Sequence, residues 1–208
     1  MASEYDLTGA IAAGADLVIW SAHKFLGGPT AGIVAGRRDL VRASFLQHRG
    51  IGRAMKVGKE GIVGAIAALE AWAERDPAAI RSREEAIVTL WFERLAHVPG
   101  LALRRLPDWT GNPIDRVELT VGRDAGLFAW ELASRLVGRS PSIRVRDDLA
   151  DSGVVHLDPC NLTHDESIAV AVAIAEEIEA ARSAGDGFRE SFAEHRANGL
   201  AGALAWPD

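Results

Sequence analysis

The apolar positions in the first part of the chain predict two strands and several helices. Residues 17–20 and 33–35 are apolar runs short enough for strands, and a turn rich in glycine separates them. Over residues 59–75, apolar side chains recur every three or four positions, which is the spacing of one helix face. Helices are therefore expected over residues 11–13, 39–47, 59–75 and 77–97.

The second part of the chain predicts a small α+β domain. Val117, Leu119 and Val121 alternate with polar residues, which is typical of a strand with one buried face. Thr163 and Glu166 have the spacing of a capping box, in which each side chain bonds the backbone N–H of the other at the start of a helix. Strands are expected over residues 101–106, 116–121, 142–146 and 154–157, and helices over residues 125–137 and 163–182.

Composition and charge fit a globular protein and exclude several function classes. With 48% hydrophobic and 25% charged residues among 208, the chain can bury a core. It has no apolar run near the ~20 residues of a membrane span, and its start lacks the basic and apolar regions of a signal peptide, so we expect a cytoplasmic protein. A net charge of −6, with acids and bases interspersed, argues against nucleic-acid binding.

Neither a disulfide nor a metal site is expected. Cys160 is the single cysteine, which excludes an intrachain disulfide, and we expect it to be a small buried residue rather than a nucleophile. Four histidines lack the spacing of zinc ligands with cysteine or acids: His97, His156, His164 and His195.

One lysine, Lys24, lies in the turn between the two predicted strands. Ser21 and His23 place a hydroxyl and an imidazole beside its amine, and Gly27 and Gly28 allow a close backbone approach. A lysine amine becomes a nucleophile when it is desolvated or placed near another cation, and it then forms a Schiff base with an aldehyde. The alternative is an ordinary solvated surface charge.

Two further groups of cations are candidates for binding an anion. Arg49, Arg53, Lys56 and Lys59 lie among glycines, so guanidinium groups and freed backbone N–H groups could hold a phosphate or carboxylate. A solvated basic loop is the alternative. Arg144 and Arg146 flank Val145 in a predicted strand and therefore point to opposite faces, so only one of them can face a cleft.

Residues 21–30 (SAHKFLGGPT) and 32–36 (GIVAG) resemble the cofactor-lysine region of fold-type I pyridoxal-phosphate (PLP) enzymes, in the aminotransferase superfamily. More narrowly, they resemble the selenocysteine synthase-like branch, which includes proteins like D-glucosaminate 6-phosphate ammonia-lyase. The similarity extends over residues 47–53, 56–60 and 156–162.

The resemblance implies an α/β fold made of the C-terminal part of a PLP-dependent transferase-like large domain plus a small C-terminal α+β domain. Residues 1–76 would be the partial PLP-binding domain with a long interdomain helix, residues 77–182 the small domain, and residues 183–208 a tail. The tail contains aromatic residues that indicate docking, Phe188, Phe192 and Trp206.

The resemblance also implies elements that precede residue 1. A phosphate-holding helix start, a ring-stacking side chain and an aspartate for the pyridinium nitrogen lie upstream in such enzymes. We therefore expect a fragment with an open parallel sheet, either unstable alone or completed by another chain.

The resemblance assigns roles to individual residues. Lys24 would carry PLP and act as the catalytic base, with Ser21, His23 and Gly28 as further cofactor contacts. The substrate-binding candidates are Arg49, Arg53, Lys56 and Lys59 for a phosphate and Arg146 for a carboxylate.

The implied function is a lyase that abstracts the α-proton, eliminates at the β-carbon and releases ammonia, with an amino acid or a sugar amino acid phosphate such as D-glucosaminate 6-phosphate as substrate. The alternatives are a transferase of the aminotransferase or L-seryl-tRNA selenium transferase kind, and an inactive remnant with a role in association. A homo-oligomer, dimeric or larger, is expected.

Overall fold

The chain forms two compact units. The structure, a computed structural model, describes residues 6–108 and 111–205. One unit comprises Met1–Pro77 with Trp109–Asn112, and the other comprises Ala78–Asp108 with Pro113–Asp208. We call them the lysine unit and the sheet unit. In the described part of the chain, no helix has both the length and the apolar character needed to span a membrane.

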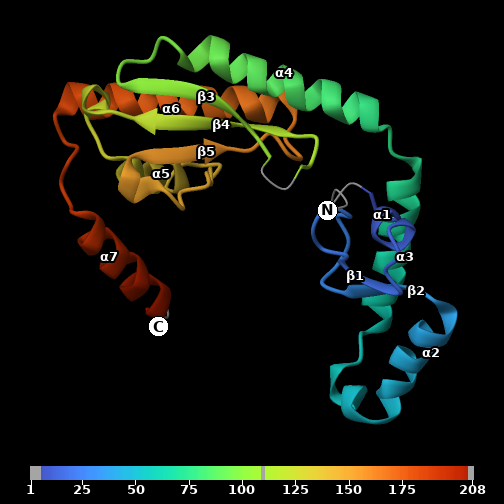
Figure 1. Ribbon diagram of the computed structural model, residues 1–208. Coiled ribbons are helices and arrows are strands. Elements are labelled where there is room, and N and C mark those ends of the chain that lie inside the picture. Colours follow the sequence, from blue (N-terminus) through green and yellow to red (C-terminus); the bar gives the residue numbers. More distant parts are fainter. Residues whose placement is uncertain (1–5, 109–110, 206–208) are drawn as a thin grey trace. The chain divides into compact units, whose positions relative to one another are not determined.

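The lysine unit is built on an antiparallel pair of strands (Figure 1). Strands β1 (Leu17–Ser21) and β2 (Gly32–Gly36) pair so that Ile19 lies opposite Val34. Both strands were predicted. The resemblance implied a parallel sheet, but these two strands pair antiparallel. The turn after β1 leads directly into β2 beside it. Such a short connection gives antiparallel pairing, because parallel strands need a long crossover connection.

Helices complete the lysine unit and agree with the predicted segments. They are α1 (Gly9–Ala12), α2 (Arg38–Leu46) and α3 (Lys59–Glu74), with two short 3-10 turns, η1 (Gln47–Arg49) and η2 (Ile51–Met55), between α2 and α3.

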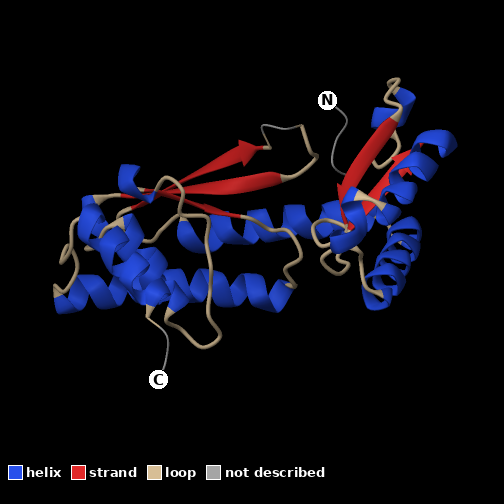
Figure 2. Cartoon of the chain, turned by 90° about the horizontal axis from the view of Figure 1, so that it is seen from below, coloured by secondary structure: helices blue, strands red, loops and turns tan. Residues whose placement is uncertain are grey.

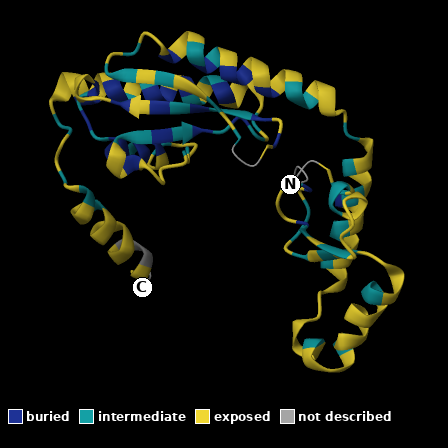
Figure 3. Ribbon diagram, viewed as in Figure 1, coloured by how far each residue is buried: buried dark blue, intermediate teal, exposed yellow. Residues whose placement is uncertain are grey.

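The lysine unit has a small interior. Among its described residues, the buried hydrophobic side chains are Ala22, Leu26 and Ala68. Larger apolar side chains remain exposed, with Ile19 at 76% and its partner Val34 at 38% of their full accessible surface. The yellow colouring of this unit in Figure 3 shows the same exposure.

The sheet unit contains a three-stranded antiparallel sheet in the order β3-β4-β5. Its strands are β3 (Leu101–Pro107), β4 (Asp115–Val121) and β5 (Val154–Leu157). The long helices lie on one face of these strands (Figure 2). They are α4 (Pro77–Leu95), α5 (Ala129–Val137) and α6 (His164–Ala184), and α7 (Phe192–Leu204) follows them.

The main hydrophobic core of the chain belongs to the sheet unit. Val117, Leu119 and Val121 of β4 are buried, as their alternation with polar residues predicted. They belong to one cluster with side chains of α4, α5 and α6, among which Trp91 and Ile174 are almost fully enclosed. Thr163 and Glu166 form the predicted capping box at the start of α6.

Two predictions for the sheet unit are wrong, one about a strand and one about the start of a helix. Residues 142–146 are not a strand, because the N–H of Ile143 bonds the carbonyl of Leu136 at 3.0 Å and only Arg146 reaches β5, as an isolated bridge to His156. The helix expected from residue 125 begins at Ala129. A left-handed Gly126, with φ of 78°, separates it from the 3-10 turn η3 (Arg123–Ala125).

The tail is more ordered than its composition indicated. It docks through Phe188 and Phe192, as predicted, while Trp206 lies outside the described residues. The Phe188 ring meets Phe128 edge-on at 4.7 Å between centroids, and Phe192 lies 5.5 Å from Trp130. Helix α7 then begins with a capping box that the prediction missed.

Candidate functional site

Lys24 lies on a turn whose backbone is fixed by hydrogen bonds. The N–H of Ala22 bonds the carbonyl of Ala31 at 2.9 Å and extends the β1–β2 ladder. Gly27 donates its N–H to the carbonyl of Lys24 at 3.0 Å, and Gly28 donates to Ala22 at 2.7 Å. The Lys24 side chain is exposed, and no ion pair involves it within the described residues. The backbone of Lys24 is therefore held in place by hydrogen bonds, while its side-chain amine is accessible to a ligand.

Close packing against α3 holds this turn in place. A Cβ atom at Gly28 would lie 3.0 Å from the carbonyl oxygen of Ala22 and 3.0 Å from the Cβ of Ala68 in α3. Gly27 has a φ of 67°, which favours glycine, and Leu26 beside it is buried. The two glycines are thus needed for the shape of the turn.

The other predicted cofactor contacts are next to Lys24 in the chain. Ser21 is the last residue of β1 and is half-buried, whereas His23 is exposed on the turn. These residues fit PLP in one respect, since an open amine, a hydroxyl and an imidazole lie within four positions of one another at a hydrogen-bonded turn.

The predicted anion-binding cations partly come together. Arg49, Arg53 and Lys56 line one pocket of about 530 Å³ between α2 and the start of α3. Lys59 is the first residue of α3 and does not line it. No ion pair is formed by these four cations within the described ranges, so their charge is available for an anion.

The same pocket includes His48, which belongs to the basic loop expected from the sequence, and apolar residues that sequence reasoning did not select. The His48 ring lies 5.1 Å from the ring of Phe45 in an edge-on contact. Phe45 and Ile62 add apolar surface. The apolar positions of α2 were a signal that could have found Phe45, because Val41 and Phe45 are four positions apart and therefore lie on the same face of the helix.

Arg146 belongs to the sheet unit. Its side chain is 48% exposed and makes long ion pairs, at 3.9 Å to Asp148 and 4.0 Å to Asp158. Arg144, the other member of the pair, lines a pocket that Arg146 does not line. Cys160, expected to be buried, is half-buried and lines that pocket as well.

Comparison with known proteins finds relatives along most of the chain. Residues 1–96 match the family L-seryl-tRNA selenium transferase (SelA). A 5'-C-glycyluridine monooxygenase-decarboxylase of Streptomyces sp is 40% identical over 156 residues, covering 74% of this chain and 39% of the relative. The D-glucosaminate-6-phosphate ammonia lyase of Salmonella typhimurium is 33% identical over 176 residues, covering 84% of this chain and 47% of the relative.

A solved structure supports the same relationship. The structure of a D-glucosaminate-6-phosphate ammonia-lyase matches with a TM-score of 0.69 and 32% identity, over 86% of this chain and 48% of that one. The fold of this chain is therefore that of the matching part of the lyase, in agreement with the predicted α/β class. This chain spans less than half the length of these relatives.

Proposed function

Since this chain is a relative of the selenium transferases and of D-glucosaminate-6-phosphate ammonia-lyase, we propose that it is the lysine-bearing part of a PLP-dependent lyase that releases ammonia from an amino-acid-type substrate. The observation that carries the proposal is the exposed Lys24 on a turn fixed by hydrogen bonds and by packing on α3. The protein acts as a homo-oligomer.

Lys24 holds the cofactor through its side-chain amine, and Ser21 and His23 contact it from the same turn. When bound, PLP supplies a sink for the electrons released at the substrate α-carbon. The Lys24 amine would serve as the general base that takes the substrate α-proton. A defined turn backbone favours this transfer, because the amine returns to one position.

The basic pocket supports an anionic substrate. Arg49, Arg53 and Lys56 converge on it, and guanidinium groups bind phosphate through paired charge-assisted hydrogen bonds. Lys59 adds positive charge at the start of α3. A sugar amino acid phosphate such as D-glucosaminate 6-phosphate carries an anionic group that suits this pocket.

A selenium transferase is the second candidate, because the family match covers residues 1–96. The charge distribution favours the lyase. Arg49, Arg53 and Lys56 line one pocket rather than a long basic stripe, and the chain carries a net charge of −6. A phosphate backbone is bound mainly through such stripes.

The first experiment tests the cofactor lysine without requiring activity. The purified chain is incubated with PLP and treated with borohydride, and mass spectrometry locates the pyridoxyl group. We expect it on Lys24, lost in Lys24→Ala and retained in Lys59→Ala. An unlabelled chain, or label spread equally over surface lysines, would contradict the proposal and favour the inactive remnant.

The second experiment separates lyase from transferase. Release of ammonia and a 2-keto acid from D-glucosaminate 6-phosphate supports the lyase, whereas amino transfer that depends on an added keto acid supports the transferase. We expect Arg53→Gln to raise KM for the phosphorylated substrate about tenfold, the loss of one charge-assisted hydrogen bond.

A further inference from the structure

The sheet unit contains a second pocket, separate from Lys24 and from the basic pocket. Its volume is about 330 Å³, at the lower end of the range of small-molecule sites. It lies between the segment 141–145, the end of β5 and the first turns of α6, with Trp91 of α4 as part of its wall. The wall is mostly apolar and includes Ile143, Val145, Leu157, Leu162 and Val170.

Two carboxylates line this pocket, and both are already engaged. Asp158 receives the guanidinium of Arg116 at 2.8 Å and the backbone N–H of Cys160 at 3.0 Å. Glu166 accepts the N–H and the hydroxyl of Thr163, each at 2.8 Å, and these hydrogen bonds lower its pKa. Arg116 therefore balances the charge of Asp158, whereas the charge of Glu166 is stabilised by hydrogen bonds from Thr163 at the start of its own helix.

The remaining charge of the pocket, Arg144, lacks such a partner. Its side chain is exposed, and the described residues give it no ion pair. This contrasts with Arg146, two positions later, which does not line the pocket and lies 4.0 Å from Asp158. An apolar wall with one unmatched guanidinium at its edge complements a ligand that is apolar at one end and anionic at the other.

We propose that this pocket binds a small organic carboxylate with an apolar body, whose carboxylate pairs with Arg144 and whose body lies against Trp91 and Ile143. A volume of about 330 Å³ suits one aromatic ring with a short chain. The site is independent of the proposed lyase chemistry, since no residue assigned to that chemistry lines it.

Cys160 provides a reporter at this site. It is the single cysteine of the chain, it lines the pocket and it is half-buried. The rate at which iodoacetamide alkylates the full chain therefore reports on occupation of this pocket alone. We expect 3-phenylpropionate to slow alkylation severalfold and in a saturable way.

Matched probes and variants test which feature recognises the ligand. 3-Phenylpropionamide has the same shape without the charge and is expected to protect Cys160 about tenfold more weakly. Arg144→Gln should weaken protection by 3-phenylpropionate by a similar factor, while Arg146→Gln and Lys24→Ala should leave it unchanged. Lys24→Ala thereby separates failure of this site from failure of the proposed lyase.

Three results would overturn the proposal. The first is the absence of protection by 3-phenylpropionate, together with no heat of binding in titration calorimetry of the same protein. The second is equal protection by the amide. The third is unchanged protection in an Arg144→Gln variant whose circular dichroism spectrum matches that of the wild type.

Discussion

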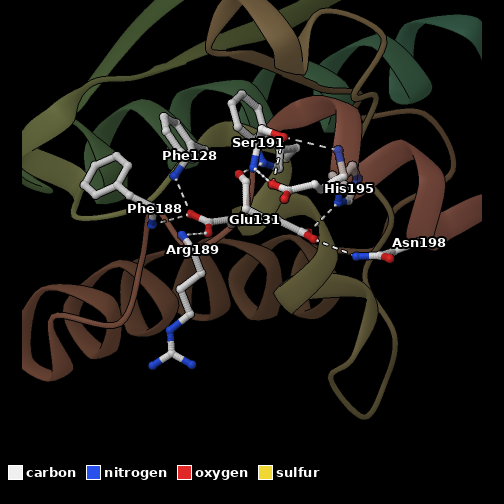
Figure 4. Close-up of polar contacts among 10 residues, drawn as sticks. Phe128, Glu131, Phe188, Arg189, Ser191, His195 and Asn198 are labelled. Carbon is white, nitrogen blue, oxygen red and sulfur yellow. Dashed lines mark hydrogen bonds and ion pairs between the residues drawn. The ribbon is translucent and has the colours of Figure 1, made fainter.

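The carboxylate of Glu131, in α5, accepts the backbone N–H of Arg189 at 2.7 Å, although 58 positions separate the two residues along the chain. The same carboxylate accepts the N–H of Phe188 at 2.8 Å and that of Phe128 at 2.9 Å (Figure 4). Glu131 is only 8% exposed. One side chain thus caps α5 and holds the tail at the start of that helix.

Replacing Glu131 should release the tail. Glu131→Ala leaves three backbone N–H groups without their acceptor, so we expect the free energy of unfolding to fall by about 1–3 kcal/mol. Limited proteolysis should then cut between residues 185 and 191 faster than in the wild type. Glu93→Ala, at an exposed position of α4, is the control. Equal cleavage rates in the two variants would show that the aromatic contacts hold the tail without Glu131.

A methyl group at Gly28 should disturb the Lys24 turn. Gly28→Ala would place a Cβ 3.0 Å from the Ala22 carbonyl oxygen, so either the turn or α3 has to move, at a cost of about 1–3 kcal/mol. We expect less pyridoxyl label on Lys24 after borohydride treatment. Gly32→Ala is the matched control, because a Cβ there meets no atom within 4 Å. The same label in both variants would mean that the turn tolerates the shift.

The capping boxes of α6 and α7 should differ in their effect on stability. Thr163→Ala removes the cap of a helix whose inner face belongs to the core, and we expect a loss of about 1 kcal/mol in urea unfolding. Ser191→Ala removes the cap of the largely exposed α7. It should change the global unfolding midpoint little and reduce helical circular dichroism. A larger midpoint change for Ser191→Ala than for Thr163→Ala would contradict this ranking.

Glu84 should make stability depend on pH. It is 4% exposed on α4, and burial raises its pKa above the usual 4.5, an effect that the nearby Arg81 opposes. The folded state therefore binds the proton more tightly than the unfolded state. Stability should fall as pH rises from about 4.5 through the folded-state pKa and remain lower above it.

The variant Glu84→Gln should remove this fall and have a higher Tm than the wild type at pH 7, with little difference at pH 4. Its neighbour Glu85 supplies a control of opposite sign, because hydrogen bonds from Arg105 lower its pKa. The contribution of Glu85 is present above its unfolded-state pKa and is lost as pH falls. If Glu84→Gln and Glu85→Gln changed Tm in the same direction at pH 7, the assignment for Glu84 would be wrong.

The elements predicted correctly from the sequence are those that depend on patterns among neighbouring residues. The spacing of Thr163 and Glu166, and the alternation in β4, depend on neighbours in the chain, and both were found in the structure. The strand predicted over residues 142–146 is wrong because the backbone hydrogen bond from Ile143 to Leu136 directs the chain away from strand pairing. Residue patterns do not indicate such a contact. The docking of Phe188 and Phe192 was predicted, but helix α7 and the hydrogen bonds from the tail to Glu131 were not, because Glu131 lies far from the tail in the sequence.

For the candidate site, the sequence located Lys24 and three of the cations that share a pocket. It favoured Arg146 over Arg144 and placed both in a strand with alternating faces, whereas the segment forms a single bridge, at Arg146. The pocket beside Arg144 arises from three segments far apart in the sequence. Such sites become visible only when the fold brings their walls together.

The small interior of the lysine unit has a consequence for how this protein is measured. A unit that buries Ala22, Leu26 and Ala68 gains far less from burial than one enclosing Trp91 and its neighbours. Its amide protons should exchange through local openings of low free energy, while the sheet unit stays closed. A sharp thermal transition in near-ultraviolet circular dichroism would then show only that the core around Trp91 is folded. Hydrogen exchange at residues 17–36 would be needed to measure the stability of the segment that carries Lys24.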